Sequence, residues 1–176
     1  MADKNKVEVN VRLKIMDVLR YNMGVAYRTN VSKVVILIGL AILGYIGYKY
    51  TNSTETIGVF LSRNIVMIML GFFILVGTPF KVWKITAMQM QSPIFAGTSK
   101  YVFQPDKIYI SMGDVNDIVP WETYSKIRET NTDFRFHVDP VQAQIIPKHC
   151  MNDEELKKLR SIIEEANPEE IYDLRQ

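Results

Sequence analysis

Two long apolar runs dominate the first half of this chain and restrict what it can fold into. They extend over residues 34–48 and 65–80. A hydrocarbon core about 30 Å thick is crossed by a helix of roughly 20 mostly apolar residues, and each run reaches that length with its flanks. The sequence therefore predicts a transmembrane helical hairpin over residues 33–84, with spans at about 33–50 and 60–80.

Most of the positively charged residues near the hairpin lie at its open end, where the chain enters the first span and leaves the second. They precede the first span or follow the second: Arg12, Lys14, Arg20, Arg28, Lys33, Lys81 and Lys84. The loop between the spans contributes only Lys49 and, at the membrane edge, Arg63. Because Lys and Arg near span ends favour the cytoplasmic side, we expect a multi-pass membrane protein with both termini in the cytoplasm. The charged first thirty residues do not have the pattern of a cleaved signal peptide.

The basic residues nearest the membrane interface allow two interpretations. They are Arg20, Arg28, Lys33, Lys81 and Lys84. Anionic headgroups attract each such side chain by about 1 kcal/mol, which favours a lipid-binding surface. The preference for positive charge on the cytoplasmic side accounts for most of them without a specific lipid, and we favour this simpler interpretation.

The segment before the hairpin, residues 1–32, combines a strand with a short helix. Valine and leucine alternate with polar residues over residues 7–14, which is typical of a strand with one covered face. From Asp17 the apolar spacing changes to three and four, and the Asp17 carboxylate is suited to cap a helix near the membrane surface. The strand requires partners from another part of the chain.

Residues 85–176 predict a cytoplasmic domain of closely spaced strands. Pro93 and Gly97 argue against one continuous helix after the second span. Strand signals then follow one another, at about 100–104, 107–112, 118–121, 124–130, 134–138 and 142–147. Tight turns between them, including one at 113–117, favour an antiparallel meander.

One helix closes this domain at about 152–166. Asn152 and Glu155 have the spacing of a capping box, and the acidic first turn suits the positive end of the helix dipole. Pro168 lies just beyond its end. A curved sheet covered by a single helix is typical of a small α+β barrel of the pleckstrin-homology-like type. The strand at 7–14 gains its partners by joining the same sheet, since both termini are expected on one side.

Three segments of the second half carry a resemblance to a known family. They read YVFQPDKIYIS, IVPWETYSKIRETNTDFRFHV and QAQIIPKHCMNDEELKKLRSII. These segments, with the strand, helix and two spans ahead of them, resemble the YcxB-like bacterial membrane proteins. The resemblance implies a bacterial cell membrane location and a pleckstrin-homology-like cytoplasmic domain of no settled biochemical function. Where such families commonly read Pro-Lys-Arg, this sequence has Pro147, Lys148 and His149.

No residue pattern in the sequence predicts catalysis. His149 and Cys150 are adjacent, but no second Cys/His pair lies at the spacing of a metal site. Asp114 begins a calcium-loop fragment that lacks its closing glutamate, so we interpret it as a turn. No glycine-rich phosphate loop occurs, and a net charge of +2 is too small to indicate a nucleic acid partner. We therefore expect no enzymatic activity, no cofactor and no metal.

Four residues remain as candidate contacts for a partner or an anion: Trp121, Tyr124, Lys148 and His149. Trp121 is more often part of a core than of a binding surface, so core packing is the simpler interpretation. Lys148 and His149 precede the closing helix, where a lipid phosphate or a peptide carboxylate would find positive charge and free N–H groups.

The resulting function hypothesis is a non-enzymatic, membrane-anchored interaction module of the inner leaflet, surrounded by membrane lipids. It would bind a protein or peptide partner at its cytoplasmic domain, for example by strand addition. The alternatives are a membrane immunity or stress-protection protein against a toxin or bacteriocin, and a lipid-headgroup-binding domain. An enzyme acting on lipid is disfavoured because no catalytic set can be assembled. The oligomeric state stays open, since Gly39, Gly44 and Gly47 are not spaced as G-x-x-x-G.

Overall fold

The computed structural model describes residues 6–175, apart from the side chain of Ile94. It is an α+β chain that divides into two compact units. The sheet unit consists of Met1–Val18 and Met88–Gln176, and the helical unit consists of Leu19–Ala87. The sheet unit is thus built from both ends of the chain.

The helical unit contains most of α1 and two long helices. Their bounds are α1 Ile15–Ala26, α2 Asn30–Thr51 and α3 Ile57–Gln89. Both α2 and α3 are long and apolar enough to cross a membrane. They extend beyond the predicted spans, and α3 continues through Pro79, which lies inside the helix. α1 begins before Asp17, whose carboxylate accepts the Lys14 backbone N–H at 2.9 Å, so Asp17 caps from within the first turn.

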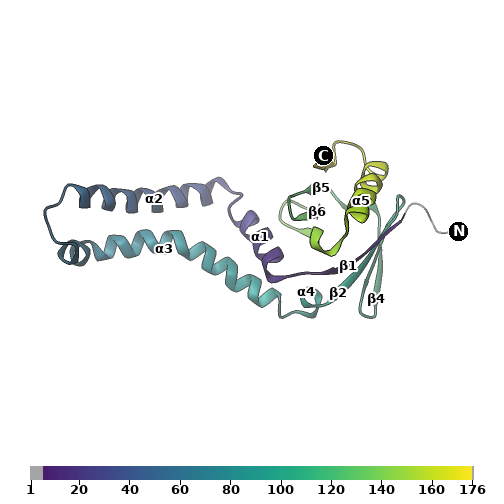
Figure 1. Cartoon of the computed structure of the whole chain (residues 1–176), viewed down its shortest axis with the longest axis horizontal. Coiled ribbons are helices and arrows are strands. Elements are labelled where there is room, and N and C mark those ends of the chain that lie inside the picture. Colours follow the sequence, from purple (N-terminus) through teal and green to yellow (C-terminus); the bar gives the residue numbers. More distant parts are fainter. Residues whose placement is uncertain (1–5, 176) are drawn as a thin grey trace. The chain divides into compact units, whose positions relative to one another are not determined.

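Two glycines bring α2 and α3 into close contact within the helical unit, where the helices lie side by side (Figure 1). A Cβ atom added at Gly39 would lie 2.8 Å from a methyl carbon of Leu75, and one added at Gly71 would lie 2.8 Å from Leu43. Close to the connecting loop, the Lys49 ammonium donates to the buried Asn64 side chain at 2.9 Å. Most large apolar side chains on the outer faces of both helices are exposed.

The first sheet of the sheet unit has four antiparallel strands in the order β1-β2-β3-β4. They are β1 Val7–Arg12, β2 Thr98–Phe103, β3 Ile108–Met112 and β4 Val115–Val119. Val9 of β1 lies opposite Tyr101 of β2. The N-terminal strand therefore joins the second half of the chain in one sheet, as its alternating pattern predicted. A single turn of helix, α4 Pro93–Ala96, precedes β2.

The second sheet has the order β7-β6-β5-β8. Its strands are β5 Lys126–Glu129, β6 Asp133–His137, β7 Ala143–Pro147 and β8 Tyr172–Asp173. The structure thus has two four-stranded sheets where the sequence predicted one. Between β4 and β5 the chain leaves the extended conformation after Pro120 and forms the 3₁₀ turn η1, Trp121–Thr123. The short strand β8 pairs in parallel with β5, which the meander prediction did not include.

Two local predictions in this half were wrong. The expected turn at 113–117 is confined to its start, where Gly113 has a φ of 58°, and Asn116 and Asp117 lie within β4. The strand expected at 118–121 was wrong in its bounds: Ile118 and Val119 are the last residues of β4, and Trp121 begins η1. Polar residues occur in β4 because it is an edge strand with little burial.

The closing helix α5, Asp153–Ala166, covers one end of the core. Its capping box is complete: the Asn152 side chain accepts the Glu155 N–H at 2.9 Å, and the Glu155 carboxylate accepts the Asn152 N–H at 2.8 Å. Leu159, Ile162 and Ile163 are buried on its inner face. They pack with inward residues of both sheets, namely Val7, Val9, Phe103, Ile108, Ile127, Phe134, Phe136 and Ile146.

Candidate functional site

A cavity of about 470 Å³ opens in the sheet unit, between the inner face of the first sheet and strand β7. Most of its lining is apolar, contributed by residues such as Val11, Leu13, Phe95, Ile110, Met112, Val115, Val119 and Ile145. Four polar residues also line it: Ser99, Tyr101, Asp117 and Gln144. The volume lies within the range of small-molecule sites, roughly 300–1,000 Å³.

The register of the first sheet brings these polar residues together. Side chains alternate between the two faces of a strand, so Ser99 and Tyr101 of β2 lie on the same face. Tyr101 is paired with Ile110 of β3, and Ile110 is paired with Asp117 of β4. Ser99, Tyr101 and Asp117 therefore share one face of the sheet, although two turns of the chain separate Asp117 from the other two.

The hydroxyl groups of β2 differ from the other buried polar groups of the sheet unit. Ser99 is 6% exposed and Tyr101 is 8% exposed. Neither side chain has a hydrogen-bond partner among the residues that the structure describes, and both line the cavity. Burial raises the pKa of Tyr101, which keeps its phenol protonated and able to donate.

Gln144 of β7 is held in place from the core. The Tyr124 hydroxyl donates to the Gln144 carboxamide oxygen at 2.8 Å. Burial also raises the pKa of Tyr124, so this donor stays protonated. The carboxamide nitrogen of Gln144 is left as a donor at the cavity wall. Tyr124 is thus a positioning residue for the cavity rather than an exposed contact.

Trp121, the other aromatic candidate, belongs to the core. It is 3% exposed and packs near Phe103 and Phe136, with ring centroids 6.3 and 6.2 Å away. Its indole N–H donates to the Gln104 carbonyl at 2.8 Å. The structure therefore places Trp121 and Tyr124 where side chains support the sheet, and neither presents a surface to a partner.

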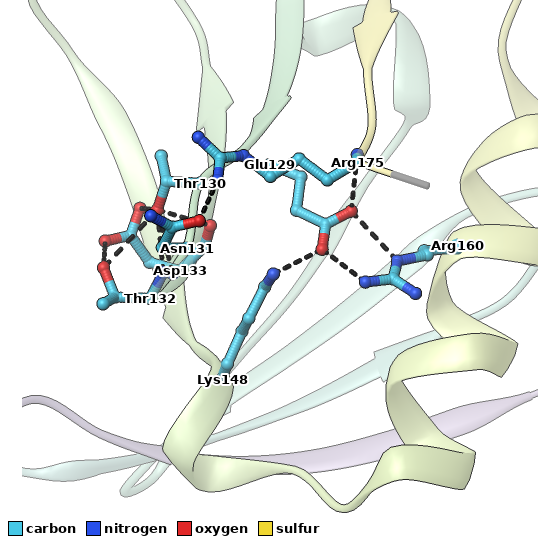
Figure 2. Close-up of polar contacts among 8 residues, drawn as sticks. All are labelled: Glu129, Thr130, Asn131, Thr132, Asp133, Lys148, Arg160 and Arg175. Atoms are coloured by element: carbon cyan, nitrogen blue, oxygen red, sulfur yellow. Dashed lines mark hydrogen bonds and ion pairs between the residues drawn. The ribbon is translucent and has the colours of Figure 1, made fainter.

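Lys148, the third candidate, is engaged by a buried carboxylate. Figure 2 shows Glu129, which is 2% exposed, at the centre of four hydrogen bonds from three residues. Lys148 donates to one carboxylate oxygen, Arg160 donates to both at 3.0 and 2.6 Å, and the Arg175 backbone N–H donates at 3.0 Å. Burial acts to raise the pKa of Glu129, but the hydrogen bonds from Arg160 and Lys148 outweigh it, so the pKa is lowered.

A second buried carboxylate, Asp133, closes the turn between β5 and β6. The Thr130 and Thr132 hydroxyls each donate to it at 2.9 Å, and the Arg135 guanidinium donates at 2.7 Å. Burial acts to raise the pKa of Asp133, and the contacts with Arg135 and the threonines reverse this and lower it. Arg175 also contacts Asn131 in this turn (Figure 2). Both carboxylates fix the frame of the second sheet.

His149, the fourth candidate, contacts the start of α1. Its Nε2 atom lies 2.9 Å from a carboxylate oxygen of Asp17, the oxygen that also accepts the Lys14 N–H. Cys150 follows, with its thiol 3.8 Å from the Arg12 carbonyl. Lys148 and His149 are neighbours in the sequence but contact different carboxylates, Glu129 and Asp17 respectively. No group of three or more His, Cys, Asp or Glu side chains that could hold a metal occurs in residues 6–175.

The five basic residues that the sequence assigned to the membrane interface all lie in the helical unit. Each is exposed: Arg20, Arg28, Lys33, Lys81 and Lys84.

Sequence reasoning missed the cavity residues Ser99, Tyr101, Asp117 and Gln144. The available signal was a serine and a tyrosine at alternate, inward positions of a strand, but their common cavity depends on the pairing of three strands.

The fold defines an α+β protein with two long apolar helices and a two-sheet unit that contains a lined cavity. Residues 103–163 match the YcxB-like protein family, from the end of β2 through most of α5. This match confirms the resemblance over that segment. Comparison with curated proteins and with solved structures gives no match.

Proposed function

We propose that this chain is a non-enzymatic, membrane-anchored binding module of the bacterial inner membrane, and that it binds its ligand in the cavity of the sheet unit. The observation that carries the proposal is the cavity itself: it is largely apolar, with polar groups on its walls. This combination is the usual form of a small-molecule site.

The helical unit supports the anchoring part of the proposal. Large side chains on α2 and α3 face outward, including Leu37 at 64%, Val66 at 77% and Phe73 at 75% exposure. Water would make this surface a strong aggregation site, whereas lipid would solvate it. We expect the two helices to cross the membrane as a hairpin, with the basic residues at its open end on the cytoplasmic side.

The buried carboxylates support the binding part. Glu129 ties β5 to α5 and to the segment after β8, and Asp133 fixes the turn that leads to β6. A frame fixed in this way keeps β7 and Gln144 in position, and preorganised sites lose less entropy on binding. Because Lys148 and His149 are already paired with carboxylates, we do not assign the ligand to them.

A pair of tryptophan substitutions on β4 tests this proposal. Val115 lines the cavity and is 68% exposed, while Ile118 lies on the opposite face of the same strand and is 56% exposed. Val115→Trp should obstruct the cavity without disturbing the core, and Ile118→Trp is the matched control. Native mass spectrometry of the full chain, extracted from its own membranes, should show a bound small molecule that Val115→Trp loses and Ile118→Trp keeps. The proposal fails if all three proteins carry the same molecules, or none.

A further inference from the structure

We infer that the cavity between the first sheet and β7 takes a small amphiphile with an apolar body and a protonated amine, and that Asp117 contacts the amine. This inference rests on the proposed function and deepens it by naming the ligand class. It depends on three features: the apolar walls, the sign of the charge at the cavity, and two hydroxyls on the cavity wall.

The apolar walls set the character of the ligand's body. Strands β1, β3 and β4 contribute Val11, Ile110, Met112 and Val119, and β7 contributes Ile145 from the opposite side. A ligand in contact with both sides would lose apolar surface to water at about 25 cal/mol for each Å² buried. An entirely polar molecule would gain nothing from these walls, so the body must be hydrocarbon.

The sign of the charge at the cavity selects the polar group. Asp117 is the single ionisable acid in the lining, and no Lys, Arg or His side chain lines the cavity among the described residues. One carboxylate oxygen of Asp117 accepts the Ile118 N–H at 2.8 Å, which leaves the other oxygen available. A carboxylate or phosphate ligand would meet like charge without a cation, whereas an ammonium group would form a charge-assisted hydrogen bond.

The two hydroxyls of β2 add a further reason to expect a ligand. Ser99 and Tyr101 are more than nine-tenths buried as whole residues, and their hydroxyls line the cavity without a hydrogen-bond partner in residues 6–175. No buried polar side-chain atom is left unpaired in the described part of the chain, so both hydroxyl oxygens open onto the cavity, where a ligand can reach them. An ammonium group has three N–H donors, so it can reach Asp117 and one hydroxyl oxygen at once.

A ligand series with one chain length and three headgroups tests the inference. The probes are octylammonium, octanol and octanoate, titrated calorimetrically at pH 7 into the full chain in phosphatidylcholine nanodiscs, with empty nanodiscs as the blank. The wild type should bind octylammonium more tightly than octanol and should not bind octanoate. Asp117→Asn should weaken octylammonium about tenfold or more and leave octanol unchanged.

Asp114→Asn is the matched control, because it removes the same charge from the adjacent turn, outside the cavity lining. It should leave the affinity for octylammonium within about twofold, since exposed charges at a distance are largely screened. Equal affinity of Asp117→Asn and the wild type for octylammonium would overturn the inference, as would tighter binding of octanoate. No binding of octylammonium to the wild type would overturn it as well.

The same series separates this inference from the proposed function. If Val115→Trp abolishes binding of octanol and octanoate while Asp117→Asn has no effect, the cavity is a binding site and only the ligand class is wrong.

An inward charge on an edge strand also discourages edge-to-edge association. Should Asp117→Asn cause self-association in sedimentation runs and leave octylammonium affinity unchanged, this protective role replaces the inferred one.

Discussion

Glu129 carries a buried charge on which three other segments of the sheet unit converge. Its buried carboxylate is the common acceptor for Lys148, Arg160 and the Arg175 backbone, which come from three separate segments. A buried ion pair adds little to the stability of the fold compared with apolar residues of equal volume. Removal of one partner is nevertheless costly, because it leaves the other charge buried and uncompensated. The alternating pattern of β5 places Glu129 inward, at a position where sequence alone would favour an apolar residue.

We predict that Glu129→Gln lowers the free energy of unfolding by about 3 kcal/mol, because Arg160 and Lys148 lose their anionic partner. The value lies at the lower end for buried pairs, since both cations keep some contact with water. Trp121 fluorescence in denaturant titrations of the full chain, in detergent and with Trp83→Phe as background, would measure it. Glu170→Gln, at an exposed position, should change stability by less than about 0.5 kcal/mol.

The same residue predicts a pH dependence. The folded-state pKa of Glu129 lies below its ordinary value of 4.5. A carboxyl group with a lowered pKa stabilises the fold fully above the unfolded value, and this contribution is lost as the pH falls through the folded value. The stability difference between the wild type and Glu129→Gln should therefore stay constant at pH values well above 4.5. It should shrink as the pH falls below 4.5. A difference that grows on acidification would contradict this assignment.

At the scale of the elements, the contact between α2 and α3 depends on one glycine of α2 more than on the others. Gly39 lies against Leu75, while Cβ atoms added at Gly44 and Gly47 would meet no atom within 4 Å. The sequence groups all three glycines of this helix together, as small residues without the G-x-x-x-G spacing. It could not separate them, because the face of α2 that meets α3 depends on the rotation of both helices.

We predict that Gly39→Leu destabilises the helical unit by about 1–3 kcal/mol, as expected for overpacking, and that Gly44→Leu does not. Thermal unfolding of the full chain in detergent, followed by circular dichroism at the helix band, would compare the two variants. Equal midpoints for both would mean that α2 does not pack on α3 through Gly39.

Elements with strong local signals were predictable from the sequence. The alternation of Val7, Val9 and Val11 predicted β1, and the capping residues Asn152 and Glu155 predicted the start of α5. Elements fixed by tertiary pairing were not. β8 is two residues long and exists because Tyr172 pairs with Ile127, and β4 contains Asn116 and Asp117 because its partner β3 supplies the ladder.

The candidate site was less accessible to sequence reasoning than the fold. Trp121, Tyr124, Lys148 and His149 were selected for their chemistry, and the structure engages all four in intramolecular contacts. The cavity arises from the distance between two sheets and from the register of β2, β3 and β4. Neither quantity is local, so no single segment of the sequence carries it.

At the scale of the whole molecule, we propose that both ends of the chain lie on one side of the membrane. β1 and β2 are hydrogen-bonded neighbours, yet 85 residues that include α2 and α3 separate the facing ends Arg12 and Thr98. If both helices span the bilayer, an even number of crossings returns the chain to its starting side. The sheet unit can then form only on that side, and we propose that this side is the cytoplasm because basic residues near span ends favour it.

Labelling of Cys150 tests this claim most directly, because it is the only cysteine of the chain and is partly exposed. A membrane-impermeant maleimide should label Cys150 in inside-out vesicles and not in intact spheroplasts. Thr54→Cys in a Cys150→Ser background, in the loop between the spans, should give the opposite result. Labelling of Cys150 in intact spheroplasts would contradict the account.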